Sequence, residues 1–377
     1  MKRMRSVQVS TLLLSFVLSH SASAVTYKAT LLHPAGYWQS GAHDVESGSQ
    51  VGYSSQNEGY NSHATLWNGT ADGFVDLHPA GFRSSFVNAA SGGVQVGFGE
   101  GPATEYHYHA LLWTGTAASS IDLHPAGWGF STIFDLSDGY QVGQVSNAPI
   151  GGGRRATIWY SSAESAVELP AAGYVDTFAS AASGQSQVGS GAKLGTMLSY
   201  HALLWHGPTA DVVDLNPAGW AGTRALGASG AHQVGFGYPN GSNGGAHAVL
   251  WNSTAASAID LNPAGYYHSE ATALADGIQV GLGTGFKTGG EAHALLWRGS
   301  AETAFDLHES LGTSGLNFLW SRASSVSADG TIVGTAYTDQ WGYAVMWTPV
   351  PEPSTYLLMT LATPTVVIVR RRRPEGV

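Results

Sequence analysis

The stretch FRSSFVNAASGGVQVGFGEGPATEYHYHALLWTGTAASSIDLHPAG, residues 82–127, decides the fold of this 377-residue chain because variants of it recur. Three markers keep step with a period of about 46 residues. One marker is a tryptophan, found at Trp67, Trp113, Trp159, Trp205, Trp251, Trp297 and Trp347. Another is Gln-Val-Gly, which starts at Gln50, Gln95, Gln141, Gln187, Gln233 and Gln279. The third is the glycine that ends a Pro-Ala turn, at Gly36, Gly81, Gly127, Gly173, Gly219 and Gly265. Markers in step over most of a chain indicate a tandem repeat.

Each repeat contains four short β-strand signals. In residues 82–127 these are 85–90, 94–98, 109–113 and 120–123. Most units place Asp-Gly or Ser-Gly between the first two strands, a pair that suits the positive φ angles of a tight hairpin. No stretch has a sustained helical period. Four strands in about 45 residues are typical of a β-propeller blade.

The two ends of the repeat region predict the number of blades. Six complete units run from 37 to about 312, and a seventh, 316–347, contains only three strands. Residues 27–32 look like a fourth strand without the other three. We therefore predict one all-β domain, residues 25–349, a seven-bladed β-propeller of four-strand repeats of ~46 residues whose ring is closed by the N-terminal strand. The alternative is a ring of six blades plus a separate fragment.

Composition excludes several classes of function. The chain has no cysteine, so a disulfide framework, a Cys-type zinc site and a thiol nucleophile are excluded. Seven of the 16 lysines and arginines lie in residues 1–24 and 350–377, whereas 24 of the 26 acids lie between them. Residues 25–349 thus have 9 cations, 24 acids and a net charge of −15. This acidity argues against nucleic acid as a partner.

Residues 1–24 have the layout of a secretory signal peptide. Lys2, Arg3 and Arg5 precede a short apolar run, 11–18, and Ala22-Ser23-Ala24 fits the small-residue site cut by signal peptidase. The apolar run is too short for a membrane span. We expect export through the inner membrane.

Residues 350–377 contain three elements in order. Pro351-Glu352-Pro353 comes first, then a mostly apolar stretch, 356–369, and then Arg370, Arg371, Arg372 and Arg373. An apolar stretch followed by arginines predicts a short transmembrane segment with its basic end in the cytoplasm. One interpretation is an ordinary tail anchor. The order of the motifs, however, resembles the PEP-CTERM sorting signal. That resemblance implies processing near Pro-Glu-Pro by an exosortase, a membrane protease and transpeptidase. It also implies transient membrane attachment, a final place at the cell surface or outside the cell, and a link to exopolysaccharide and biofilm.

The repeats have a resemblance of their own. Gln-Val-Gly, His-Ala-x-Leu-Trp and Asp-Leu together resemble the HAF-type extracellular repeat of bacteria, although leucine often stands here where that family has phenylalanine. The resemblance implies an extracellular location and no established chemistry.

Residues present in every blade are expected to serve the blade itself. We expect the tryptophans to pack between blades. Equivalent histidines and carboxylates, such as His109 and Asp122, lie on a ring, too far apart to share one ion. We therefore expect them to form structural hydrogen bonds, and we expect no metal and no cofactor.

One repeated feature is a candidate ligand site. The turn between fourth and first strands ends in an aromatic residue and shares a face of the ring with the variable loop between second and third strands. Flat aromatic faces beside Gly-, Asn- and Ser-rich loops suit sugars. The alternative is that each aromatic packs against its own turn. The candidate residues are Tyr37, Phe82, Trp128, Tyr174, Trp220 and Tyr266.

A catalytic site in a symmetric ring requires residues that break the symmetry. Several do, but none is spaced as an acid–base pair, and no nucleophile motif is present. We therefore predict a non-catalytic binding module for exopolysaccharide or matrix proteins. A purely structural matrix protein and a polysaccharide lyase or hydrolase are the alternatives. The symmetry-breaking residues are Asp44, Glu46, His107, Asp135, Arg154, Arg155 and Glu309.

Overall fold

The computed structural model describes residues 26–56, 61–148, 153–196, 199–242 and 245–350. The predicted signal cleavage site at Ala22 and Ala24 and the predicted sorting signal, from Pro351 to Arg373, lie outside the described residues. Within the described ranges, no helix is long and apolar enough to cross a membrane. The apolar stretch 356–369 is also outside those ranges.

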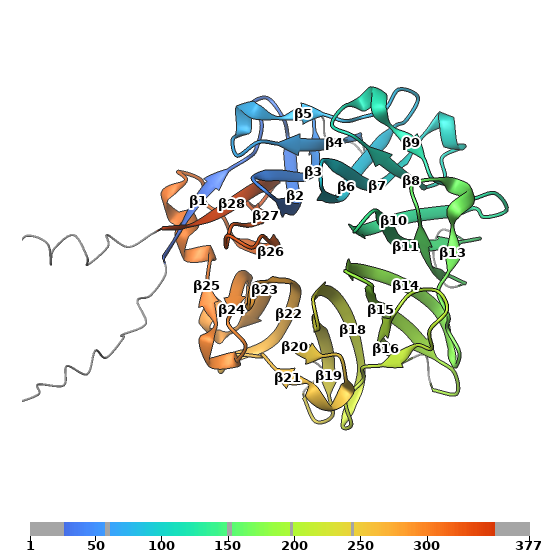
Figure 1. Ribbon diagram of the computed structural model, residues 1–377. Coiled ribbons are helices and arrows are strands. Elements are labelled where there is room, and N and C mark those ends of the chain that lie inside the picture. Colours follow the sequence, from blue (N-terminus) through green and yellow to red (C-terminus); the bar gives the residue numbers. More distant parts are fainter. Residues whose placement is uncertain (1–25, 57–60, 149–152, 197–198, 243–244, 351–377) are drawn as a thin grey trace, which may run out of the picture. The chain divides into compact units, whose positions relative to one another are not determined.

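Seven antiparallel sheets of four strands form a ring, in agreement with the predicted propeller (Figure 1). Blade 1 is β2 (Gln39–Glu46), β3 (Ser49–Ser55), β4 (Ser62–Trp67) and β5 (Val75–Asp76). Blade 2 is β6 (Ser84–Ser91), β7 (Val94–Glu100), β8 (His109–Trp113) and β9 (Ile121–Asp122). Blade 3 is β10 (Phe130–Ser137), β11 (Tyr140–Ser146), β12 (Arg155–Trp159) and β13 (Val167–Glu168). Blade 4 is β14 (Tyr174–Ser183), β15 (Ser186–Lys193), β16 (Tyr200–Trp205) and β17 (Val213–Asp214).

Blade 5 is β18 (Trp220–Ser229), β19 (His232–Pro239), β20 (His247–Asn252) and β21 (Ile259–Asp260). Blade 6 is β22 (Tyr266–Ala275), β23 (Ile278–Gly285), β24 (Ala292–Trp297) and β25 (Phe305–Asp306). The helical segments in the described ranges are short 3-10 turns: η1 (Ala71–Gly73), η2 (Pro102–Thr104), η3 (Ala117–Ser119), η4 (Ala163–Ser165), η5 (Ala255–Ser257), η6 (Phe286–Thr288), η7 (Ala301–Thr303) and η8 (His308–Thr313).

The seventh blade is built from both ends of the ring. Its order is β1 (Thr26–Leu31), β28 (Gly342–Val350), β27 (Ile332–Tyr337) and β26 (Trp320–Val326). The N-terminal strand is thus the outer strand of the last blade, as predicted, and Figure 1 shows β1 beside β28. Pairing the two ends leaves neither as an open sheet edge inside the ring.

The Gln-Val-Gly motif has a separate role for each residue. Gln95 connects two turns, because its side chain accepts a hydrogen bond from the Gly115 N–H and donates one to the Gly93 carbonyl. Val96 is fully buried. A Cβ on Gly97 would lie 2.0 Å from the Phe86 carbonyl oxygen of the first strand, so only glycine fits there. The equivalent glycines meet the same obstacle, which explains why the triplet recurs.

The seven repeated tryptophans lie between neighbouring blades. All of them are completely buried. Trp159 of blade 3, for example, packs with Val96, Leu112 and Leu123 of blade 2. This confirms the predicted packing role, and each indole removes on the order of 200 Å² from water.

The first strand of each blade contains a β-bulge about midway along its length. The pairing register slips at residues 42–44, 87–89, 133–135, 179–181, 225–227, 271–273 and 323–325. Because the first strands lie innermost in the ring (Figure 1), the bulges place one extra residue per blade beside the central axis. The first-to-second hairpins then turn through positive φ angles, as at Asp138 and Gly139.

Candidate functional site

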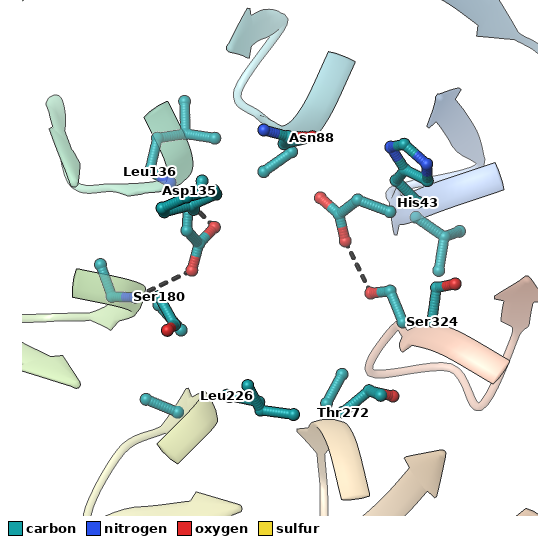
Figure 2. A pocket seen from close by; sticks show the side chains of 18 of the residues that line it. His43, Asn88, Asp135, Leu136, Ser180, Leu226, Thr272 and Ser324 are labelled. Carbon is teal, nitrogen blue, oxygen red and sulfur yellow. Dashed lines mark hydrogen bonds between the residues drawn. The ribbon is translucent and has the colours of Figure 1, made fainter. Parts of the chain in front are cut away.

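The bulges line an axial pocket of about 280 Å³. Figure 2 shows side chains from successive blades converging on it, among them His43, Asn88, Ser180, Leu226, Thr272 and Ser324. Several of these side chains bridge to the next blade. His43 Nδ1 lies 2.8 Å from the Val87 carbonyl, and Asn88 donates to the Ile133 carbonyl. The pocket is therefore small, and several of the polar side chains that line it are hydrogen-bonded to the neighbouring blade.

Two aspartates that break the symmetry, Asp44 and Asp135, line this pocket together. Burial raises the pKa of both carboxyl groups, and the charge of Asp44 adds to the effect on Asp135, whose pKa rises to about 7. Yet both carboxylates already accept bonds from the protein. Asp44 accepts from the Ala90 N–H and the Ser325 hydroxyl, and Asp135 accepts from the N–H groups of Leu136 and Ala182.

Glu46 has the same kind of role, because its carboxylate accepts from Ser91 Oγ and the Gly92 N–H of the next blade. The carboxylates of Asp44, Glu46 and Asp135 thus link neighbouring first strands through hydrogen bonds. Nowhere in the described ranges do three or more His, Asp or Glu side chains gather in a way that could hold a metal ion.

In five blades the repeated histidine and carboxylate form a hydrogen bond with each other, as expected from the sequence. The ring of His109 lies 2.7 Å from Asp122, and the pairs His63–Asp76, His201–Asp214, His247–Asp260 and His293–Asp306 repeat the contact. In blade 3, where arginine replaces histidine, Arg155 lies 3.7 Å from Glu168.

The histidine of the Pro-Ala-Gly turn joins one blade to the next. His124 Nε2 lies 2.9 Å from the Trp128 carbonyl and Nδ1 lies 2.8 Å from the Ser131 hydroxyl, which also accepts from the Ala110 N–H. Where asparagine replaces this histidine, Asn216 donates to the Trp220 carbonyl and accepts from Thr223. The same pair of bonds is kept by either residue.

The six candidate aromatics are distributed one to a blade over blades 1–6, so the structure does not gather them into one pocket. Each is half-buried. Several contact their own blade: Tyr174 donates to Asp214 at 2.6 Å, Trp220 meets the ring of His247 and Tyr37 meets Phe74. Packing against the blade is therefore part of their role, and each side chain remains partly exposed.

Three of these aromatics line open grooves. Phe82 lines one of about 370 Å³ whose lining includes Arg83 and Tyr106 and no carboxylate. Trp128 and Tyr266 line the two larger grooves. The groove of blade 3, about 770 Å³, lies between the turn that ends in Trp128 and the segment with Glu164 and Glu168. The groove of blade 6, about 470 Å³, lies between the turn that ends in Tyr266 and the segment with Glu302 and Asp306, and Glu309 also lines it. Both combine an aromatic side chain and a proline with carboxylates, two in blade 3 and three in blade 6.

A second set of aromatics on the same face was missed in the sequence. Trp38, Tyr106, Tyr238, Tyr267 and Phe286 lie beside the aromatic turns or in the loops between second and third strands, and each exposes more than a third of its surface. Phe286 is 89% exposed. Their positions differ from blade to blade, so the period did not reveal them. We call the side with these turns and loops the loop face.

The remaining symmetry-breaking residues lie near the loop face. Arg154 forms a bidentate pair with Asp176, and its guanidinium lies 5.0 Å from the ring of Phe178. This pairing lowers the pKa of Asp176 to about 2. His107 packs against the ring of Phe130. These contacts satisfy the charges internally and do not form an acid–base pair.

No family model and no curated protein sequence matches this chain. Among solved structures, the β-propeller domain of the Trilobed protease from Pyrococcus furiosus has a TM-score of 0.56 at 8% identity over 82% of this chain and 96% of that one. It is described as having an open velcro topology, whereas β1 closes the ring here.

Prolyl oligopeptidase B from Galerina marginata has a TM-score of 0.57 at 8% identity, over 85% of this chain and 50% of that one. A puromycin hydrolase has a TM-score of 0.55 at 13% identity, over 82% and 51%. The chain thus spans about half the length of these two enzymes. At such identities the likeness shows the propeller fold alone.

Proposed function

We propose that this protein is an exported, non-catalytic propeller that binds polysaccharide on its loop face. The grooves beside Trp128 and Tyr266 are the observation that carries the proposal. A pyranose ring stacks its C–H face on an aromatic side chain, and its hydroxyls donate to carboxylates such as Glu164 and Glu302. Repeated sites on a rigid ring also suit a repeating polymer, because linked sites increase avidity.

The exposed aromatics of the loop face support the same proposal. These side chains place exposed aromatic surface beside the turns that carry the candidate residues. Phe286 lies 6.1 Å from Tyr267, and Trp38 lies 5.1 Å from Trp341, each in an edge-to-face pair. Such rigid rings provide contact area at little cost in side-chain entropy.

The lack of catalysis is part of the proposal. The oxygens of Asp44 and Asp135 serve as acceptors for the protein's own donors, and the likeness to peptidases is one of fold at about half their length. A structural role in an extracellular matrix remains the second candidate, since the same aromatic face could contact matrix proteins.

The proposal includes the route to the cell surface. Signal peptidase would cut after Ala24, and an exosortase would process the chain near Pro351-Glu352-Pro353. Coexpression with an exosortase should yield a product shortened at this motif by intact mass. Replacing the motif by three alanines should leave the tail attached. An unshortened wild-type product would argue against this route and leave the binding proposal untouched.

The binding proposal is tested with a glycan array followed by calorimetry on the oligosaccharides that bind. The variant Trp128→Leu with Tyr266→Leu keeps apolar bulk against the blades but removes both aromatic faces. We expect affinity to fall about tenfold or more, the loss of roughly one stacking contact. Tyr160→Leu, at an aromatic that is 51% exposed outside the grooves, is the matched control. An array without any binding would overturn the proposal.

A further inference from the structure

The grooves of blades 3 and 6 are the same site, three repeats apart. Adding 138 to a residue number in the first groove gives its equivalent in the second: Pro125 and Pro263, Ala126 and Ala264, Trp128 and Tyr266, Ala163 and Ala301, Glu164 and Glu302, Ala166 and Ala304, Glu168 and Asp306. All of these residues line one groove or the other. The ring therefore contains a repeated site of defined composition.

One position within this site varies among blades. It lies five residues after the buried tryptophan, and it is acidic in blades 1, 3 and 6 but alanine in blades 2, 4 and 5. The acids are Asp72, Glu164 and Glu302, and the alanines are Ala118, Ala210 and Ala256. Glu164 and Glu302 are exposed, so neither acid is required by the core. The fold itself tolerates alanine at this position, so the acid is not needed for folding.

Blade 4 shows which ligand group fits between the aromatic and the outer-strand carboxylate. There the protein places its own ammonium group. Lys193 Nζ lies 3.0 Å from Asp214 and 6.0 Å from the centroid of the Tyr174 ring. Tyr174 and Asp214 are the equivalents of Trp128 and Glu168 in blade 3. A cation held by a carboxylate beside an aromatic face gains from both contacts.

We infer that the groove of blade 3, and more weakly that of blade 6, binds the ammonium group of an amino sugar, with the pyranose on Trp128 or Tyr266. This rests on the proposed polysaccharide binding and narrows it to hexosamine units that lack the N-acetyl group. The described residues that line the blade 3 groove include no lysine or arginine. Lys287 lines the blade 6 groove, and its positive charge makes the electrostatic potential there less favourable for a cation.

Charge also argues against the opposite ligand class. A uronic acid or sulfated sugar would meet Glu164 and Glu168 in blade 3, or Glu302, Asp306 and Glu309 in blade 6, in a domain with a net charge of −15. An anionic sugar and these carboxylates would repel each other, which slows association of the sugar with the protein. Arg155 approaches Glu168 only to 3.7 Å, which leaves that carboxylate able to accept further bonds.

The test is calorimetry of the full-length chain with chitosan hexaose, which has free amino groups, and with its fully N-acetylated counterpart. We expect chitosan hexaose to bind at least about tenfold more tightly, and salt to weaken it. Glu164→Gln with Glu168→Gln removes both carboxylates of the blade 3 groove. This variant should bind chitosan hexaose about tenfold more weakly and leave the affinity for the acetylated sugar unchanged. Asp211→Asn with Glu291→Gln removes two exposed charges outside the grooves and should change neither affinity by more than about twofold.

The outcomes separate the two proposals. Equal affinity for both sugars, or a chitosan affinity that survives the double glutamine variant, would overturn the amino-sugar site. If acetylated or neutral oligosaccharides bound and lost affinity in Trp128→Leu with Tyr266→Leu, the general proposal would stand without it. Failure of every oligosaccharide to bind would remove both.

Discussion

The carboxylate of Asp44 accepts a hydrogen bond of 2.6 Å from the hydroxyl of Ser325, which is 281 residues away in the sequence. Asp44 belongs to the first blade and Ser325 to the last, and the other oxygen of Asp44 accepts from the Ala90 N–H of blade 2. One side chain thus joins three consecutive blades at the axis. It supplements the closure made at the outer edge by β1 and β28.

Removal of this contact should loosen the ring. We expect Asp44→Ala to lower the free energy of unfolding by about 1–3 kcal/mol, because it leaves a buried N–H without an acceptor. Ser325→Ala removes one bond and should cost about 1 kcal/mol. Urea denaturation measures both. An Asp44→Ala variant as stable as wild type, or more stable, would contradict a stabilising role for this carboxylate.

Asp135 at the axis should titrate near neutrality. Burial, and then the charge of Asp44, raise the pKa of Asp135 to about 7, whereas an unfolded chain titrates this group near 3.8. Between those values the folded state holds a proton that the unfolded state has released, so this group favours folding at low pH and its contribution is lost as pH rises. Carboxyl-carbon NMR should show the midpoint, and Asp44→Asn should lower it. An Asp135 midpoint near 4 would contradict the shared pocket.

The features that the sequence predicted are those that every blade must have. A Cβ on Gly97 meets a carbonyl at 2.0 Å, and Trp113 fills an interblade space completely, so neither position tolerates change and both keep the period. The closure of the ring by the N-terminal strand could be predicted because the last repeat has only three strands and residues 27–32 look like the fourth. The predicted site residues Trp128 and Tyr266 line grooves, but the period could not say so, since all six turns carry an aromatic.

The rest depends on residues that differ between blades. Glu164 and Ala118 are equivalent solvent-facing positions, so the period does not distinguish them. The contact of Lys193 with Asp214 and Tyr174, which indicates the ligand group, is made in one blade and has no counterpart in the repeated motifs. Asp44 and Asp135 are 91 residues apart, and each follows the bulge residue of its first strand. The sequence singled out both as symmetry-breaking residues of first strands, which line the axis, but it did not reveal the bulges that bring them to one pocket. The bulge itself leaves no clear mark in the sequence.

Turn histidines should make the fold sensitive to mild acid. Burial lowers the pKa of His33, His78 and His124, and stacked partners such as His63, 3.9 Å from His78, lower it further, although Asp76 opposes the effect. The unfolded histidines accept protons near pH 6.5 and the folded ones only at lower pH. Stability is thus complete above about pH 6.5 and falls as pH decreases below it.

Asparagine offers the matched variant, because Asn216 and Asn262 already make the same bonds in blades 4 and 5. A triple variant, His33→Asn, His78→Asn and His124→Asn, should lose less of its urea midpoint between pH 7.5 and pH 5 than the wild type does. His232→Asn, at an exposed position, should keep the wild-type pH dependence. An unchanged pH dependence in the triple variant would place the acid sensitivity elsewhere.

The interblade tryptophans should differ in what their N–H groups contribute. Trp159 Nε1 donates to the Leu123 carbonyl at 3.0 Å, whereas Trp113 Nε1 is buried and has no acceptor among the described residues. Replacement by phenylalanine leaves a similar void at both sites but breaks a bond only in blade 3. We therefore expect Trp159→Phe to destabilise the ring by about 1 kcal/mol more than Trp113→Phe. Equal losses in urea denaturation would indicate that Trp113 has an acceptor too, such as a buried water.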